Sequence, residues 1–145
     1  MRILGVDVGR RRVGLAISDP SATLARPLMT ISVGNTDALD RVASEVMRLA
    51  REDDGLARVV VGVPRRLDGT PGDQTVFVER FIAALRARVP MPVHAEDERL
   101  SSREAESRLA VGERDWKKRK ARLDAAAAAV ILQDYLDRQE ATAHE

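Results

Sequence analysis

Asp7, Glu98 and Asp124 are acidic residues in three separate segments whose side chains could together hold divalent cations. Asp7 belongs to the short apolar run 3–8, which alternation along a strand would divide between two faces. A carboxylate at the end of such a strand is poorly solvated and requires hydrogen-bond donors or a cation. The sequence also allows a simpler role, in which Asp7 caps the turn that follows it.

Asp124 belongs to an alanine-rich stretch that we expect to be helical from Lys117 to Arg138. The other positions on its helical stripe are Ala127, Ala128, Ile131 and Tyr135. Because this stripe should be buried, we expect the Asp124 carboxylate to point inward, towards a strand end. The alternative is a surface ion pair with Lys120, one helical turn earlier.

The third acid comes from the run Glu96-Asp97-Glu98, directly after an expected strand at 90–95. Segments that follow the strands of an α/β sheet often carry functional groups. Alternation sets Glu96 and Glu98 on one side and Asp97 on the other, so we choose Glu98 and keep Asp97 in reserve. The alternative is an acidic cap for a following helix.

Carboxylate oxygens suit Mg²⁺ or Mn²⁺ better than zinc. The chain has no cysteine, which excludes disulfides, thiolate metal sites and a cysteine nucleophile. Two hard cations about 4 Å apart could activate a water and stabilise the leaving oxygen of a phosphodiester. The three acids therefore predict a metal-dependent hydrolase of nucleic acids, with Asp7, Glu98 and Asp124 as catalytic and metal-binding residues.

Basic residues gather in three clusters although the formal net charge is only +1, from 24 Lys and Arg against 23 Asp and Glu. Such clusters could contact phosphates if folding brings them together, and they could equally be solvated turns. Aromatic residues make up only 3% of the chain, which argues against recognition by base stacking. The expected nucleic-acid contacts are Arg10, Arg11, Arg12, Arg65, Arg66, Lys117, Lys118, Arg119, Lys120 and Arg122.

The elements that must position these residues follow from hydrophobic periodicity and turn signals. Expected strands are 3–8, 13–18, 28–33, 58–63 and 90–95, and expected helices are 39–50, 76–85, 101–109 and 117–138. The first three strands should form an antiparallel meander, and the buried β-branched run at 58–63 implies parallel pairing. This order predicts a single α/β domain over 1–138, with a mixed sheet and helices on both faces, followed by a disordered polar tail at 139–145.

Several motifs, in order along the chain, are shared with one known family. They are Gly5-Val6-Asp7-Val8-Gly9 with 12–19, Val61-Gly62-Val63-Pro64 with 67–70, 97–102, and Lys118-Arg119-Lys120 with Leu123-Asp124 and 131–133. The chain resembles the bacterial pre-16S rRNA nuclease family, also described as Holliday junction resolvase-like, of the RNase H-like superfamily. The resemblance implies an RNase H-like fold, processing of the 5′ end of pre-16S rRNA during ribosome biogenesis, and an acidic site at Asp7, Glu98 and Asp124.

One departure concerns the fourth strand, after which junction resolvases of this fold carry a glutamate. This chain has Gly62-Val63-Pro64 there, so the remaining acid must come from Asp97 or Glu98. A resolvase acting on branched DNA also needs two sites about a two-fold axis, and the sequence shows no dimer seam. We therefore expect RNA as the main partner, with branched DNA as the alternative, and a monomer or weak dimer.

Two further function classes were weighed. A catalytically silent RNA-binding factor of ribosome assembly remains open, because the acids could be structural. An ATP-binding protein related to sugar kinases also opens with Asp-Val-Gly after a first strand, but it needs a second lobe that 145 residues do not accommodate. No apolar run approaches the roughly 20 residues that span a bilayer, so we expect no membrane association and a cytoplasmic location.

Overall fold

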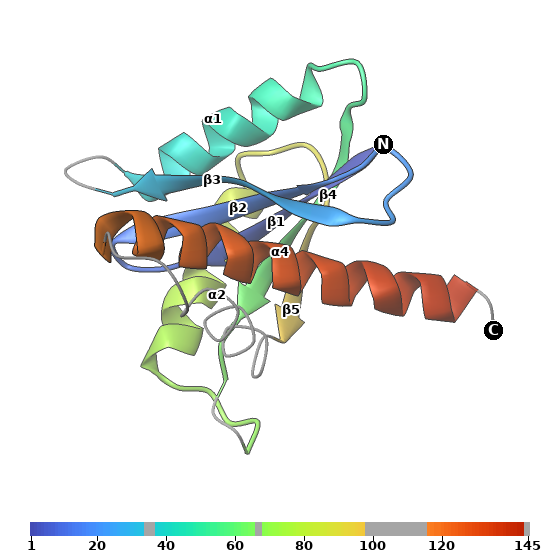
Figure 1. The fold of residues 1–145 in the computed structure, drawn as a ribbon. Coiled ribbons are helices and arrows are strands. Elements are labelled where there is room, and N and C mark those ends of the chain that lie inside the picture. The colour runs from blue at the N-terminus through green and yellow to red at the C-terminus, as the bar shows by residue number, and fades with distance from the viewer. Residues whose placement is uncertain (34–36, 66–67, 98–115, 144–145) are drawn as a thin grey trace.

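The computed structural model describes residues 1–33, 37–65, 68–97 and 116–143, with five strands and three helices within those ranges. They are β1 (Arg2–Val8), β2 (Arg12–Ser18), β3 (Ala25–Ser32), α1 (Ala38–Ala50), β4 (Leu56–Val63), α2 (Asp73–Arg86), β5 (Val93–Asp97) and α4 (Trp116–Ala143). The sheet order is β3-β2-β1-β4-β5, and α4 lies across it (Figure 1). β1, β2 and β3 pair antiparallel, whereas β4 and β5 continue the sheet in parallel. The predicted mixed α/β sheet is confirmed.

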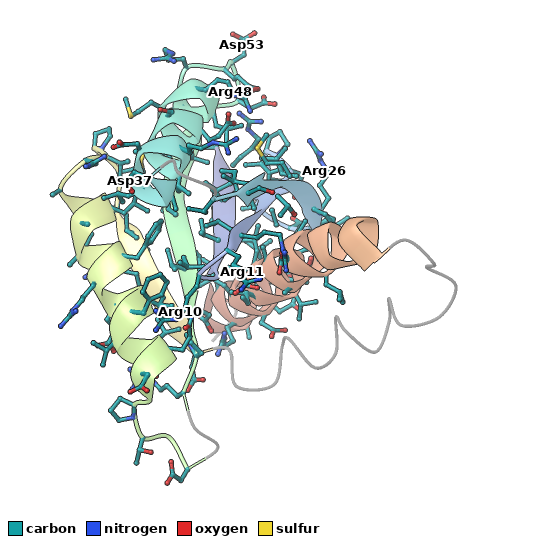
Figure 2. All side chains as sticks on the ribbon, turned by 90° about the vertical axis from the view of Figure 1, so that its left-hand side faces the viewer. Arg10, Arg11, Arg26, Asp37, Arg48 and Asp53 are labelled. Carbon is teal, nitrogen blue, oxygen red and sulfur yellow. The ribbon has the colours of Figure 1, made fainter. Side chains whose placement is uncertain are left out.

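The sheet separates two helical layers. α1 and α2 cover one face and α4 covers the other, as the turned view shows (Figure 2). Along β1, Leu4 and Val6 belong to the core beneath α1 and α2, whereas Ile3 packs in the core beneath α4. Alternation therefore places Asp7 on the α4 face. β1 is the central strand of the sheet, as expected for the strand that carries Asp7.

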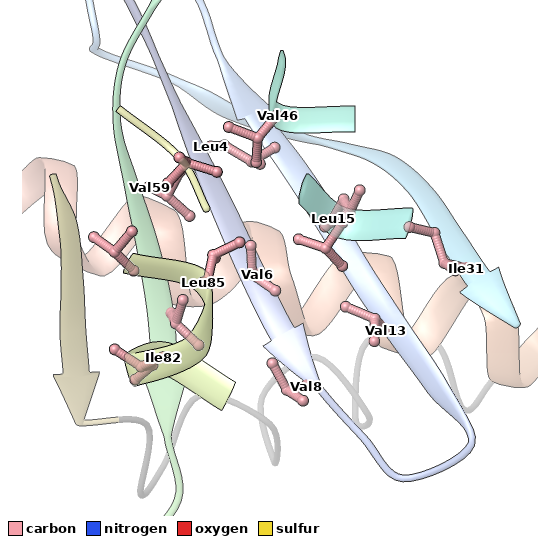
Figure 3. Packing of buried hydrophobic residues seen from close by; sticks show 14 of the residues in the cluster. Leu4, Val6, Val8, Val13, Leu15, Ile31, Val46, Val59, Ile82 and Leu85 are labelled. Carbon is pink, nitrogen blue, oxygen red and sulfur yellow. The ribbon is translucent and has the colours of Figure 1, made fainter. Parts of the chain in front are cut away.

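The larger core lies between the sheet and the pair α1 and α2 (Figure 3). Branched aliphatic side chains from both layers fill it, including Val6, Leu15, Val46, Ile82 and Leu85, each at most 3% exposed. Complete burial of one such side chain is worth about 1.5–3 kcal/mol. This face supplies most of the apolar stabilisation of the fold.

On the α4 face, small residues at several positions of β1 and β2 let the helix approach the sheet backbone closely. A Cβ added to Gly5 would lie 2.8 Å from the Cβ of Leu132, and one added to Gly14 would overlap the carbonyl oxygen of Asp124. Glycine permits such an approach because it has no side chain. Ala16 and Ala128, both fully buried, continue the same contact.

Several boundaries differ from the sequence expectation, and those of β3, β5 and α4 change its interpretation. β3 begins at Ala25 rather than at 28, and Pro27 pairs with Ala16 beside a register shift. Proline is tolerated there because β3 is an edge strand of the described sheet. β5 begins only at Val93, since Pro90 and Pro92 cannot donate to a strand ladder.

At the other end, α4 runs to Ala143, so residues 139–143 of the expected disordered tail are helical. The helix expected at 101–109 lies outside the described residues. Among the helices that the structure describes, none is both long and apolar enough to cross a membrane.

Candidate active site at the end of the central strand

Asp7 lies near the end of β1 with its side chain half-buried on the α4 face. Its direct partner across the antiparallel pair is Gly14 of β2. Facing residues in such a pair have Cα atoms roughly 4.5–5.5 Å apart. The neighbour of Asp7 on this face is therefore a residue with no side chain.

Asp124 occupies the space above that glycine. Its carbonyl oxygen lies where a Cβ of Gly14 would stand, and its carboxylate is half-buried. Ala127, Ala128, Ile131 and Tyr135 of the same helical stripe are buried, as the periodicity predicts. The structure thus brings Asp7 and Asp124, far apart in sequence, to the same face and the same end of the sheet.

The Asp124 carboxylate is bound by Arg12 at the start of β2. The distance from Arg12 Nε to Asp124 Oδ2 is 2.6 Å, and the two side chains are 29% and 27% exposed. The sequence had offered Lys120 as the alternative partner and had assigned Arg12 to nucleic acid. Alternation along β2 is the signal that could have predicted this contact. It places Arg12 on the same face as Gly14 and Ala16, beneath α4.

The acids of β5 divide between the two faces as alternation predicts. Glu96 pairs in register with Gly62, and its half-buried side chain forms an ion pair with Arg138 of α4. Asp97 pairs with Val63, whose side chain packs in the core on the α2 side. The register therefore places Asp97 on the face away from Asp7, which weighs against its reserve role as a ligand. Glu98 lies outside the described residues.

The chemistry of the donor set suits a hard divalent cation. Asp7 and Asp124 both offer carboxylate oxygens at one end of the sheet, and the chain has no thiolate that would favour zinc. Within the residues that the structure describes, which leave out Glu98, no group of three His, Cys, Asp or Glu residues is arranged to hold a metal. Two predicted ligands thus lie on one face, and the third remains a prediction.

His94 of β5 does not belong to this acidic site. Its side chain is exposed, as expected of a strand surface residue, and its ring centroid lies 6.2 Å from that of Tyr135. The Tyr135 hydroxyl accepts a hydrogen bond of 2.8 Å from Arg58. These contacts attach α4 to β4 and β5 and give His94 no place beside Asp7.

The loop between β4 and α2 is tied to the strand ends next to Asp7. Thr75, only 1% exposed, donates its hydroxyl to the Pro64 carbonyl and accepts from the Gly72 amide at 2.9 Å. Gln74 donates its side-chain amide to the carbonyl of Val8, at 3.3 Å. These bonds hold the start of α2 beside the end of β1, a role that the sequence motif alone did not reveal.

Three of the predicted basic residues, Arg10, Arg11 and Arg65, lie near this end of the described molecule. The Arg10 guanidinium lies 4.6 Å from the centroid of the Phe77 ring on α2, and Arg65 pairs with Glu79 at 3.5 Å. Arg11 is exposed, and Figure 2 shows it with Arg10 at the same end of the molecule. Arg66 is outside the described residues, as are the side chains of Lys117, Lys118, Arg119, Lys120 and Arg122, whose backbone belongs to α4.

A mixed sheet in this order, crossed by a C-terminal helix, is the architecture of the RNase H-like class. A family model described as RuvX, Holliday junction resolvase, matches residues 1–138. The chain belongs to this family of nucleases.

Relatives carry the provisional name pre-16S rRNA nuclease. A protein of Chloroflexus aurantiacus is 44% identical over 135 residues, covering 93% of this chain and 86% of the relative. A protein of Anaeromyxobacter sp. strain K is 44% identical over 139 residues, covering 96% and 98%. The chain is therefore similar to these relatives over most of its length.

Solved structures support the fold. The chain superposes on Thermus thermophilus RuvC in complex with a Holliday junction with a TM-score of 0.56 and 18% identity, covering 98% of this chain and 97% of that one. The fowlpox virus Holliday junction resolvase gives a TM-score of 0.52 at 14% identity, covering 96% and 99%. At such identities the likeness establishes the RNase H-like fold alone.

Proposed function

We propose that this protein is a divalent-metal-dependent nuclease that hydrolyses RNA phosphodiester bonds and processes the 5′ end of pre-16S rRNA in the cytoplasm. The observation that carries the proposal is that Asp7 and Asp124 both lie next to Gly14, on one face at one end of the sheet. The RNA substrate is supported by the name of relatives that are 44% identical over most of their length.

Asp7, Asp124 and Glu98 would hold Mg²⁺ or Mn²⁺ at the end of β1. When bound, such ions supply an activated water and neutralise the charge that develops on the phosphate. The half-buried setting of the two described carboxylates strengthens their attraction for a cation relative to water. The strand ladder fixes the backbone of Asp7 and the packing of α4 fixes that of Asp124, so these two residues are already on the same face.

The substrate backbone would be gripped by the basic residues at the same end. Arg10, Arg11 and Arg65 provide positive charge beside the β1–β2 turn and the β4–α2 loop, and the basic start of α4 would extend it. Contacts to phosphates fix position without reading sequence. Sequence choice at the rRNA end would then depend on RNA structure or on a partner that presents it.

The proposal is tested by incubating an RNA that spans the 5′ end of the 16S rRNA precursor with wild type, Asp7→Asn and Asp124→Asn. We expect wild type to cleave in Mn²⁺ or Mg²⁺ but not in EDTA, and both variants to be inactive. Asp53→Asn is the matched control, because Asp53 is exposed at the opposite end of the molecule (Figure 2). Cleavage by Asp7→Asn at the wild-type rate would disprove the site.

A four-way DNA junction in the same assay separates the second candidate, a Holliday junction resolvase, which the family description favours. Paired symmetric nicks in the junction, together with a stable dimer in sedimentation, would identify the resolvase. We expect preferential cleavage of the RNA and a monomer or weak dimer. RNA binding without any cleavage would leave a silent assembly factor.

A further inference from the structure

The ion pair between Arg12 and Asp124 connects two residues that are 112 positions apart. Its short distance and the limited exposure of both side chains make it a defined contact rather than a loose surface pair. Arg12 is also held through its backbone, because its carbonyl accepts the Gly9 amide at 2.9 Å. The backbone of Arg12 therefore has a fixed position at the β1–β2 turn, and the ion pair with Asp124 holds its guanidinium.

The pair is not needed to attach α4 to the sheet. Ile131 and Leu132 are fully buried against the strands. The Gln133 side chain accepts from the Ala25 amide at 2.9 Å and donates to the Thr23 carbonyl at 3.0 Å. With these contacts farther along the helix, a partly exposed ion pair adds little to the stability of the fold. Stabilisation of the fold therefore does not explain why Arg12 binds the carboxylate of Asp124.

We propose that Arg12 competes with the divalent cation for the carboxylate of Asp124. Arg12 holds that carboxylate on the sheet before metal binds and gives up Oδ2 when the cation arrives. The inference rests on the proposed function, since it takes Asp124 as a metal ligand. Arg12 is thus a positioning residue that lowers the affinity of the site for metal.

Release of Arg12 also couples the binding of metal to the binding of nucleic acid. A freed guanidinium extends the positive charge of Arg10 and Arg11, and its fork of donors matches the oxygens of a phosphodiester. A phosphate that accepts these donors stabilises the released position of Arg12 and thereby favours the cation on Asp124. By linkage, metal and nucleic acid each raise the affinity of the other.

The experiment measures Mn²⁺ affinity without substrate, from the electron paramagnetic resonance signal of free Mn²⁺ during titration. Arg12→Ala should bind Mn²⁺ roughly three- to tenfold more tightly than wild type, because one partly exposed charge pair no longer opposes the cation. Arg11→Ala, which removes the same charge one residue away, should change the affinity by less than about twofold. Unchanged or weaker binding by Arg12→Ala would overturn the inference.

A second measurement uses the folded wild-type protein and so does not depend on the stability of a variant. The Nε–H resonance of Arg12, assigned from its loss in Arg12→Lys, should shift when Mg²⁺ is added. In Asp124→Asn the charge pair is absent, so the Arg12 Nε–H resonance should already lie near its Mg²⁺-shifted position when no Mg²⁺ is present. Addition of Mg²⁺ to this variant should change the resonance little. An Arg12 resonance that ignores saturating Mg²⁺ in wild type would contradict the competition.

Failure of the proposed function gives a different result. If Asp7→Asn and Asp124→Asn bind Mn²⁺ as wild type does, these residues are not the metal site and the nuclease proposal fails with the inference. If both variants lose Mn²⁺ but Arg12→Ala gains none, the metal site stands and only the role of Arg12 is rejected.

Discussion

The two faces of the sheet are built by the same strands from different kinds of residue. Towards α1 and α2, β1 and β2 present Leu4, Val6 and Leu15, which are completely buried among other branched side chains. Towards α4, the same strands present Gly5 and Gly14, which the helix approaches within contact distance of the backbone. Large side chains fill the layer between the sheet and the helices α1 and α2, which we call the thick face. At Gly5 and Gly14 there are no side chains between the sheet and α4, and we call this side the thin face.

The difference shows how one strand can serve stability and chemistry at once. A thick apolar layer stabilises the sheet but keeps the next layer about 10 Å away. A thin layer contributes less burial and instead lets the backbone of α4 rest on Gly14, which brings Asp124 beside Asp7. Four predictions test this division of roles, in order of decreasing effect.

Asp7→Asn removes a charged group from the thin face without changing the side-chain volume. We expect cleavage to fall by roughly 10³-fold, the upper range for loss of one group that stabilises charge in a transition state. The thermal midpoint should shift by no more than a few degrees. Steady-state cleavage measures the rate, and circular dichroism measures the thermal midpoint. A large loss of stability with an unchanged rate would show that Asp7 serves the stability of the fold rather than catalysis.

Leu15→Ala changes the thick face. Leu15 is 0% exposed, so the variant should lose about 3 kcal/mol of unfolding free energy, within the range for buried leucines. The rate per folded molecule should stay within about twofold of wild type. Leu24→Ala is the matched control, because Leu24 is 67% exposed and its truncation should cost less than about 0.5 kcal/mol. Urea denaturation distinguishes the two leucines.

Gly14→Ala adds one methyl group where the faces differ most. Because that methyl overlaps the Asp124 carbonyl, the first described turns of α4 must move away. We expect a loss of about 10²-fold in cleavage, as for a ligand displaced by about 1 Å, and a loss of 1–3 kcal/mol in stability. A variant with normal activity would show that Asp124 does not need its position on Gly14.

Arg11→Gln tests the rim of the site rather than its centre. Arg11 is exposed, so one phosphate contact and its counterion release should be lost while the fold is unchanged. RNA binding should weaken by roughly two- to fivefold, and the slope of log K against log salt should flatten by nearly 1. Fluorescence anisotropy over a salt series measures this, and an unaltered slope would remove Arg11 from the substrate surface.

Much of the fold was predictable because local patterns determine it. Alternation in 3–8 and 13–18 and the β-branched run before Pro64 predicted three strands and their parallel or antiparallel pairing. The start of β3 was missed because Ala25-Arg26-Pro27 has no strand signal, and pairing with β2 overrides that composition. The helical state of 139–143 was missed because polarity alone predicted a loose end.

The sequence could place Asp7 and Asp124 on one face of the sheet, but it could not predict their partners. Asp7 and Asp124 could be chosen because each interrupts an apolar face of its own element. The sequence assigned Arg12 to nucleic acid and did not predict its ion pair with Asp124, since nothing in a sequence states that positions 112 apart will touch. The role of Glu98 in metal binding stays a prediction.

Asp124 lies on α4 (Trp116–Ala143), near the C-terminal end of the chain, so it is added to the sheet late in synthesis. The hairpins of β1, β2 and β3 connect neighbours and can form early on the ribosome, because their contacts are local. The acidic pair forms only once α4 has emerged and docked. If the proposed function holds, a growing chain forms the turn that carries Arg10 and Arg11 before Asp124 can join Asp7.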